Sequence, residues 1–431
     1  MTLFTNVASV NLNDSMYFEI LHGLWTGKKP PYTKAGVIRN TNFTASGEID
    51  YSDVAWLDVE VKELKKRSLK QGDIIIERSG GGPKQPVGRV VQFKRSDGFF
   101  SFSNFTTVVR VKEPNEIDPR FAFYVLLNLY QSGKTDDIQR RTTGLRNLDF
   151  KAYKERAIFP LLFYIEQNRI SYVLNTIQTA IEQQARFISL TRELKTTIMR
   201  RLFSEGLRGE KRKETEIGLV PESWEIRTLE EMILTIDYGT SVKCDYSSKG
   251  YPVLRIPNII GGPINIDDLK FGQPKKNEIK KMKLRKGDLL FVRTNGVQEN
   301  AGRCSIFDNE IEDCYFASYL IRVRLDTAQL IPEFLNDYVV TEVGKSYLSG
   351  RAIRVADGKF NINSGTIRKV LVPVPTIKEQ EEIASIIKFL DQKINLEYQK
   401  QSILLDLFKT LLHQLMSGQI RVNNFHLPDL L

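Results

Sequence analysis

Two short motifs in this 431-residue chain suggest phosphate chemistry, but neither has the spacing that this chemistry needs. Gly133-Lys134-Thr135 and Gly344-Lys345-Ser346 match the end of a phosphate-binding loop, which would also require a glycine at Asn128 or Val339. The sequence also shows no acyl-transfer elbow, no HExxH motif, no paired catalytic carboxylates with a base, no amino-methyltransferase motif and no nuclease core. We therefore predict a binding protein without a catalytic centre of its own.

Basic and amide side chains gather in loops beside predicted strands. Arginine can hydrogen-bond guanine through two donors and asparagine can bind adenine, whereas lysine mostly contacts phosphate. For any one of these residues the alternative is a solvated surface charge, and for Arg78 and Arg293, which occupy the same repeat position, it is a structural salt bridge. The candidate DNA-binding residues are Lys28, Lys29, Tyr32, Arg39, Asn40, Asn42, Arg78, Ser79, Lys84, Arg140, Arg141, Arg146, Lys243, Arg255, Asn258, Arg293, Thr294, Asn295, Arg351 and Arg354.

Composition and cysteine usage set bounds on the partners and on the compartment. Lys+Arg 62 against Asp+Glu 52 gives a net charge of +10, which suits a polyanionic partner, although solubility alone would also explain it. The three cysteines form no ligand pattern with the histidines, so we expect no metal site and a reduced, cytoplasmic compartment. No signal peptide is recognised, and the longest apolar run, residues 157–165, is too short to cross a membrane.

The elements that must position these loops occur twice. Glu166-Gln167 opens one amphipathic stretch and Glu379-Gln380 opens another, and 379 − 166 = 213. The ends of the two stretches, Ser204 and Ser417, keep the same separation of 213 residues without a gap. A repeat of this length indicates a duplicated module.

Apolar residues recur every three or four positions in both stretches, which predicts two long amphipathic helices. Each helix of about 40 residues would extend about 60 Å and would expose an apolar stripe unless it found a partner. We expect the two helices to pack antiparallel, with one β-rich domain near each end; the alternative is that each stripe packs only on its own domain. The predicted packing residues are Ile170, Leu174, Ile177, Ile181, Ile198, Leu202, Ile383, Ile387, Leu390, Ile394, Leu404, Leu411 and Leu415.

The segments before the helices read as short strands and loops, with strand-like runs at 74–76 and 105–111 and a helix near 121–130. These segments also repeat, at the looser shifts of 215 and 216 residues. The predicted fold class is α+β, with two mixed, mainly β domains, two long helices packed as an antiparallel coiled coil, and pseudo-twofold symmetry. The expected parts are a first recognition domain (1–160), a helix (161–207), a linker (208–223), a second recognition domain (224–375), a helix (376–420) and a tail (421–431).

Several motifs together resemble one known family, the specificity (S) subunits of type I restriction–modification systems. The second half carries Gly218–Glu225 before its domain, Gly287-Asp288 at a strand start, Gly358–Ile362 in a turn, and Val372–Pro375 leading into Glu379. The likeness covers essentially the whole chain. The first half departs from the pattern, because it lacks the Val-Pro-x-x-x-Trp entry and has Phe163 at the position where Thr376 caps the second helix.

This resemblance implies the partners and cofactors. Each domain would read one half of a bipartite, asymmetric site in double-stranded DNA, and the helices would fix the gap between the halves. Two methyltransferase (M) subunits would use S-adenosylmethionine to methylate adenine N6, and restriction (R) subunits would cut DNA with ATP and Mg2+. The chain itself would bind no cofactor. The alternatives are a coiled-coil scaffold that never touches DNA, and the specificity subunit of a methyltransferase-only system.

Overall fold

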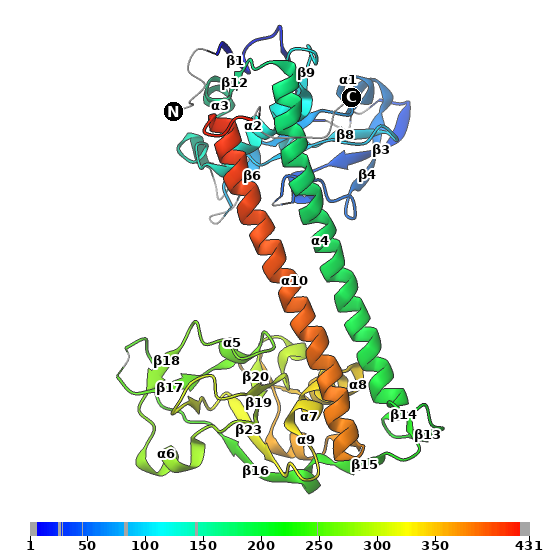
Figure 1. Ribbon diagram of the computed structural model, residues 1–431, viewed down its shortest axis with the longest axis vertical. Helices are drawn as coiled ribbons and strands as arrows, with labels where there is room; N and C mark the ends of the chain where they lie inside the picture. The colour runs from blue at the N-terminus through cyan, green and yellow to red at the C-terminus, as the bar shows by residue number, and fades with distance from the viewer. Residues whose placement is uncertain are drawn as a thin grey trace. The chain divides into compact units, whose positions relative to one another are not determined.

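The computed structural model describes residues 7–24, 27, 29–44, 46–81, 85–142, 145–247 and 249–422, without the side chains of 141, 142 and 277. The chain divides into two compact units, one of residues 1–186 with 399–431 and one of residues 187–398. Each unit contains one β-rich domain together with half of each long helix (Figure 1). The two units are described in turn.

The first unit is built from four small sheets, because its apolar runs are short and are separated by turns. Its central antiparallel sheet has the order β2-β9-β5-β7, and in a second sheet β3 pairs parallel with β8. The strands are β1 (Ser9–Asn11), β2 (Phe18–His22), β3 (Tyr32–Ile38), β4 (Ala55–Glu60), β5 (Ile74–Glu77), β6 (Ser79–Gly81), β7 (Val90–Gln92), β8 (Phe100–Phe102), β9 (Thr106–Val111), β10 (Gln139–Thr142), β11 (Leu145–Leu148) and β12 (Ile158–Pro160). The helices are α1 (Val61–Arg67), α2 (Pro119–Gln131) and α3 (Phe150–Arg156), with 3-10 turns at Asn40–Asn42 and Asp136–Ile138.

The second unit repeats this plan and adds the hairpin β13–β14. Its central sheet has the order β16-β23-β19-β21, and β17 pairs parallel with β22 as β3 does with β8. The strands are β13 (Arg212–Thr215), β14 (Gly218–Pro221), β15 (Glu225–Thr228), β16 (Ile233–Tyr238), β17 (Tyr251–Leu254), β18 (Lys270–Gly272), β19 (Asp288–Val292), β20 (Thr294–Asn295), β21 (Cys304–Phe307), β22 (Tyr315–Phe316), β23 (Leu320–Leu325), β24 (Ile353–Arg354), β25 (Phe360–Asn361) and β26 (Leu371–Val374). The helices are α5 (Ile256–Ile259), α6 (Lys276–Met282), α7 (Pro332–Val339), α8 (Glu342–Gly350) and α9 (Ser364–Arg368), with 3-10 turns at Leu229–Met232 and Gln298–Asn300.

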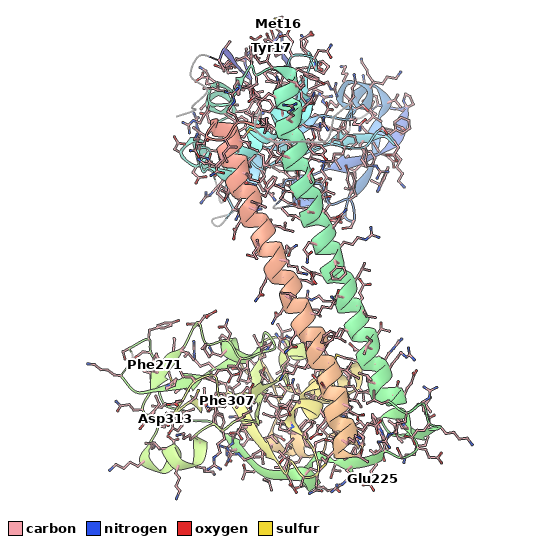
Figure 2. The ribbon with its side chains drawn as sticks, in the orientation of Figure 1. Met16, Tyr17, Glu225, Phe271, Phe307 and Asp313 are labelled. Carbon is pink, nitrogen blue, oxygen red and sulfur yellow. The ribbon has the colours of Figure 1, made fainter. Side chains whose placement is uncertain are left out.

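Burial in the second unit follows the strands of its central sheet. Phe307 on β21 lies inside the unit and is 1% exposed, whereas Asp313, in the loop before β22, lies at the surface (Figure 2). The sheet order explains this difference, since β21 pairs with β19, every residue of which is buried.

The Gly-Asp motif at the start of β5 and β19 has a structural role in both units. Asp73 accepts two hydrogen bonds of 2.7 Å from Arg110, and Asp288 accepts two of 2.7 Å from Arg324. Both aspartates are 1% exposed, so each ion pair fixes a buried turn against the neighbouring strand β9 or β23. The repeated motif therefore marks the scaffold of the sheet.

The two long helices are α4 (Tyr164–Glu205) and α10 (Ile377–Ser417), and they pack together antiparallel. In the first unit Ile170 and Leu174, near the start of α4, share a core with Leu412 and Leu415, near the end of α10. In the second unit Leu202 shares a core with residues near the start of α10. Both cores also include residues of the β-rich domains, so each stripe packs on its own domain as well. The predicted α+β fold class is confirmed.

The two ends of the helices are joined by residues that repeat at the interval of 213. Arg421 donates to both carboxylate oxygens of Glu166 at 2.6 and 2.8 Å, and the equivalent Arg208 lies 4.0 Å from Glu379. The predicted capping box at Thr376 forms only in part, because Glu379 N donates to Thr376 Oγ1 but the carboxylate accepts from Leu207 N instead. The antiparallel helices bring the start of one helix beside the end of the other. The glutamate near each helix start therefore lies beside the arginine that follows the other helix.

Residues 208–223, expected to form a linker, include the antiparallel hairpin β13–β14. None of the described helices is long and apolar enough to cross a membrane.

Candidate nucleic-acid interface

A small three-stranded sheet in the first unit collects several of the predicted DNA-binding residues. Its order is β10-β11-β6, so the hairpin β10–β11 lies beside the short strand that follows β5. Arg140 is exposed and its guanidinium contacts Asp149 at 2.5 Å, while Arg146 on the neighbouring strand is half-buried. Ser79 on β6 donates to Asn147 on β11 at 2.5 Å. The basic hairpin is thus tied to the central sheet.

The second unit has an equivalent sheet with different side chains. Its order is β20-β25-β24, and β20 follows β19 as β6 follows β5. Thr294 pairs with Asn361 across β20 and β25, and Asn295 pairs with Phe360. Arg354 on the edge strand β24 is exposed. The structure therefore brings Thr294, Asn295 and Arg354 into one small sheet, and Arg293 directly precedes it.

Arg78 and Arg293, which precede β6 and β20, each stack on an aromatic ring, although the two rings come from different elements, α3 and β16. The guanidinium of Arg78 lies 4.9 Å from the ring centre of Phe150, and that of Arg293 lies 4.9 Å from the ring centre of Tyr238. Arg293 also donates to the carbonyl of Ser318 at 3.2 Å. Stacking on an aromatic ring holds a guanidinium in place while leaving donors at its edge. Each guanidinium is thus held in place directly before one strand of a small sheet.

Other predicted residues turn out to hold loops together. Asn42 is 1% exposed, and its amide donates to the carbonyls of Asp50 and Asp53 at 3.2 and 3.0 Å. Asn258 is 1% exposed and makes the equivalent bonds, at 2.9 Å to the carbonyl of Asn265 and at 3.0 Å to that of Asp268. Both side-chain amides are buried and have internal partners, so they are not placed to read bases.

The arginines that precede these asparagines are also held by internal bonds. Arg39 donates to the carbonyl and carboxylate of Asp53 at 3.0 and 3.2 Å. Arg255 makes the same two contacts with Asp268, at 2.9 and 3.0 Å. The sequence cannot distinguish a loop clasp of this kind from a reading residue, since both need a guanidinium in a polar loop.

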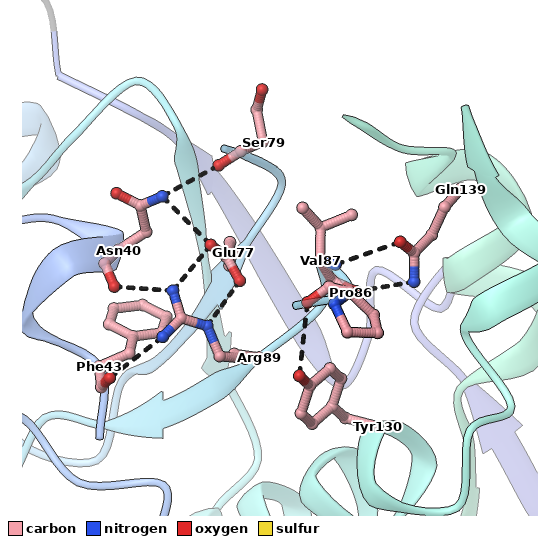
Figure 3. A network of polar contacts seen from close by, with 9 residues as sticks. All are labelled: Asn40, Phe43, Glu77, Ser79, Pro86, Val87, Arg89, Tyr130 and Gln139. Carbon is pink, nitrogen blue, oxygen red and sulfur yellow. Dashed lines mark hydrogen bonds and ion pairs between the residues drawn. The ribbon is translucent and has the colours of Figure 1, made fainter. Parts of the chain in front are cut away.

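Asn40 belongs to a buried polar network beneath β6 (Figure 3). Its amide donates to Glu77 at 3.1 Å and to the carbonyl of Ser79 at 3.2 Å. Glu77 is fully buried and accepts two bonds of 2.8 Å from Arg89, which also donates to the carbonyls of Asn40 and Phe43. A satisfied ion pair of this kind fixes the strand that leads into the small sheet.

The remaining predicted residues lie away from the small sheets or outside the described part. Lys29 and Tyr32 are exposed at the start of β3, and Lys243 is exposed in the loop before β17. Arg351, at the end of α8, stacks on Tyr347 with its guanidinium 3.7 Å from the ring centre. Lys28 and Lys84, and the side chain of Arg141, lie outside the described residues.

Three surface residues beside the small sheets were not among the predicted ones. Phe105 and Tyr319 are 43% and 57% exposed and occupy equivalent turns before β9 and β23. Lys359, in the turn between β24 and β25, donates to Asp357 at 2.8 Å, and this bond raises the pKa of Lys359. The signal that could have found the aromatic pair is the separation 319 − 105 = 214, which matches the drift between the two domains.

Among the described residues, no group of three or more His, Cys, Asp or Glu side chains is arranged to hold a metal ion. The polar groups of the small sheets are hydroxyl, amide and guanidinium groups, which are suited to hydrogen-bonding base edges and phosphates.

Comparison with known proteins agrees with this geometry. Residues 221–405 match the family described as "Type I restriction modification DNA specificity domain". The chain is 29% identical to the putative MjaX specificity subunit of Methanocaldococcus jannaschii over 42% of this chain and 43% of that protein. It is 27% identical to the EcoKI specificity subunit of Escherichia coli K12 over 82% of this chain and 73% of that protein.

Two solved structures share the fold. The S subunit of a type I restriction–modification system from M. genitalium superposes with a TM-score of 0.54 at 16% identity, over 96% of this chain and 98% of that one. A structure described as concerning "complex assembly" and "conformational transition of the type I R-M system" gives 0.55 at 15% identity, over 94% and 98%.

The duplicated fold, with one small polar sheet in each copy, defines a DNA-specificity protein built from two versions of one domain. Residues 221–405 belong to the family of type I restriction–modification DNA specificity domains, and over most of its length the chain is similar to the specificity (S) subunits of type I restriction enzymes, which are non-catalytic by family.

Proposed function

We propose that each unit reads one half of a bipartite, asymmetric DNA site. The observation that carries this proposal is that the two small sheets share one scaffold but differ in their side chains. Where the first unit has Gly80 and Arg146, the second has Asn295 and Phe360. Two readers with different hydrogen-bonding groups at matching places recognise different base sequences, so the complete site is not a palindrome.

The proposed readers are the polar groups of the small sheets. In the first unit these are Ser79, Arg140 and Arg146, and in the second they are Asn295 and Arg354, with Arg78 and Arg293 as stacked supports. Arg351, at the end of α8, is a further candidate outside the sheet. The exposed Lys29 and Lys243 would hold phosphates, one in each unit. Tyr32, in the same unit as Lys29, would pack beside the phosphate that Lys29 holds. Lys28, Lys84 and Arg141 stay candidates from the sequence.

Two equivalent apolar patches support binding of two copies of one partner, the methyltransferase subunit. On α4 in the second unit, Leu190 and Leu194 are each 52% exposed. On α10 in the first unit, Ile403 and Leu407 are 67% and 44% exposed and lie 213 positions further along. Exposed apolar residues at this spacing suit packing by a helix of another protein.

The stoichiometry of the assembly tests this surface. We expect Leu190→Lys with Leu194→Lys to remove one methyltransferase subunit and Ile403→Lys with Leu407→Lys to remove the other, each changing two subunits per chain to one. Ser189→Lys and Ser402→Lys, at equivalent exposed positions on another face of the same helices, are matched controls that leave both bound. If native mass spectrometry showed two methyltransferase subunits on either double variant, the patches would not be the docking surface.

The proposed complex works in the cytoplasm on double-stranded DNA. Its methyltransferase subunits use S-adenosylmethionine to methylate adenine N6, and restriction subunits use ATP and Mg2+ to cleave unmodified sites. This chain supplies the choice of site and binds none of these cofactors. Cleavage of unmethylated DNA by the reconstituted complex distinguishes a complete restriction system from one limited to methylation.

Methylome sequencing of cells that express the chain with its methyltransferase partner tests the reading of DNA. A split, gapped motif with methylated adenine is expected, whereas a scaffold that never touches DNA would give none. Replacing residues 1–162, which keeps β1 with its partner β12 and stops before α4, is expected to change one half of the motif only. A change in both halves would contradict the assignment of one reader to each unit.

A further inference from the structure

Two exposed aromatic residues, Phe105 and Tyr319, stand on identical tight turns beside the small sheets. In the first turn Thr106 N donates to the carbonyl of Ser103 at 3.0 Å, and in the second Leu320 N donates to that of Ala317 at 2.9 Å. Each aromatic residue is therefore the third residue of a hydrogen-bonded turn. The following strands, β9 and β23, lie inside the central sheets.

The surrounding backbone holds both turns in the same way. Arg78 N donates to the carbonyl of Phe105 at 2.8 Å, and Arg293 N donates to that of Tyr319 at 2.9 Å. On the other side, a Cβ at Gly23 would come within 2.2 Å of the Ser103 carbonyl oxygen.

The second turn rests on Gly239, where a Cβ would come within 2.4 Å of the carbonyl oxygen of Ala317 and within 2.2 Å of that of Phe316. Both turns thus rest directly on a glycine, with no space for a side chain between the backbones. The aromatic rings project from rigid positions next to the supporting arginines.

A single exposed aromatic residue is common on protein surfaces and needs no explanation. Here the same residue class recurs at the same place in two domains whose neighbouring residues differ: Asn104 precedes Phe105, and Ser318 precedes Tyr319. Residues that read bases should differ between the two halves, because the half-sites differ. A feature kept in both halves serves a task that both half-sites share.

We propose that Phe105 and Tyr319 place their rings against nucleobases of the two half-sites and contribute affinity without determining sequence. This inference rests on the proposed function. The phenyl ring of Phe105 offers no hydrogen-bond donor or acceptor to a base edge, so its contribution is apolar contact or stacking on an unstacked base step. We expect the ring of Tyr319 to act in the same way, and Tyr319→Phe tests whether its hydroxyl contributes. The positive charge of each small sheet comes from Arg140 and Arg146 in the first unit and from Arg354 and Lys359 in the second.

Binding to a duplex that carries the complete site tests this, with the chain assembled with its methyltransferase subunits. We expect Phe105→Ala and Tyr319→Ala each to weaken binding roughly tenfold, as loss of one aromatic–base contact does. The slope of log affinity against log salt should stay unchanged, since no cation is lost. Phe99→Ala and Tyr246→Ala, which remove rings that are 63% and 68% exposed elsewhere in each unit, are the controls and leave affinity unchanged.

The location of the contact has its own readout. A 2-aminopurine placed in one half-site should change fluorescence on binding, and Phe105→Ala should abolish this change only in the half read by the first unit. Phe105→Leu keeps an apolar side chain of similar size and therefore controls for folding. We expect it to restore part of the affinity that Phe105→Ala loses. Tyr319→Phe should bind like the parent chain.

The outcomes separate this inference from the proposed function. If the parent chain gave no gapped methylated motif, the proposed function would fail. If the parent chain gave the motif but both alanine variants bound within about twofold of it, only the role of the aromatic pair would be refuted. A variant that accepted new bases in the motif would show that the ring determines sequence, which would overturn the inference as well.

Discussion

The glutamine at the start of each long helix offers a sharp test of how the units are held together. Gln167 is fully buried and accepts a bond of 2.9 Å from Asp118 N, while its amide donates to the carbonyls of Glu116 and Leu162 at 2.7 and 2.9 Å. Gln380 makes the equivalent three bonds at 2.9, 3.0 and 3.0 Å. One side chain thus ties the helix start to two separate loops.

Replacing Gln167 by leucine removes all three bonds and leaves one buried N–H and two carbonyls without partners. At about 1 kcal/mol for each net hydrogen bond, the expected loss is about 3 kcal/mol, confined to the first unit. A loss of this size means that amides which exchange only when that unit opens should exchange about a hundredfold faster. Gln380→Leu is expected to act in the same way on the second unit.

Hydrogen exchange followed by mass spectrometry on the full chain can resolve the two units, which a single unfolding curve of a multidomain protein cannot. Gln183→Leu, at an exposed position on the same helix, is the control and should change stability by less than about 0.5 kcal/mol. If Gln167→Leu left exchange in the first unit unchanged, or accelerated both units equally, the clasp would not hold its unit together.

Three other perturbations have defined outcomes. Arg421→Met should destabilise its unit by about 3 kcal/mol because it leaves the buried Glu166 carboxylate unpaired. Arg208→Met should cost under about 1 kcal/mol, because Arg208 is exposed and lies 4.0 Å from Glu379, whose buried carboxylate also accepts from Leu207 N; hydrogen exchange of the two units measures both losses. Burial raises the pKa of Glu48 from 4.5 to about 7, so the folded state retains a proton that the unfolded state has lost in this window. The unfolding free energy should therefore fall as pH rises from 4.5 to 7, and Glu48→Gln should reduce this slope in a pH series. Asn42→Ala should lower the stability of the first unit by about 1–3 kcal/mol without changing the methylated motif, and a changed motif would show that this amide reads DNA.

The duplication and the helices could be predicted from the sequence because both depend on local order. Stripe residues such as Ile170 and Ile383 recur at helical spacing, and the separation of 213 residues needs no three-dimensional information. The apolar stripes required a partner for each helix, and the structure confirms antiparallel packing. Strand-like runs at 74–76 and 105–111 likewise became β5 and β9.

The choice among polar residues could not be predicted in this way. Arg39 and Arg140 are alike in sequence, yet one clasps a loop and the other is exposed on a hairpin. Likewise the buried amide of Asn42 donates to the carbonyls of Asp50 and Asp53, which lie 8 and 11 positions further along the chain. Whether a guanidinium or amide is free to read DNA depends on which backbone carbonyls the folded loop brings beside it.

The sequence by itself therefore determined the repeat, the helices and the family resemblance, because these follow from residue spacing. Only the tertiary structure decided that Glu166 pairs with Arg421, 255 positions away, and not with the arginine at the end of its own helix. It also decided that Phe105 and Tyr319 stand on matching rigid turns. These contacts join segments distant in sequence, and their energies depend on burial and distance, which residue order alone does not specify.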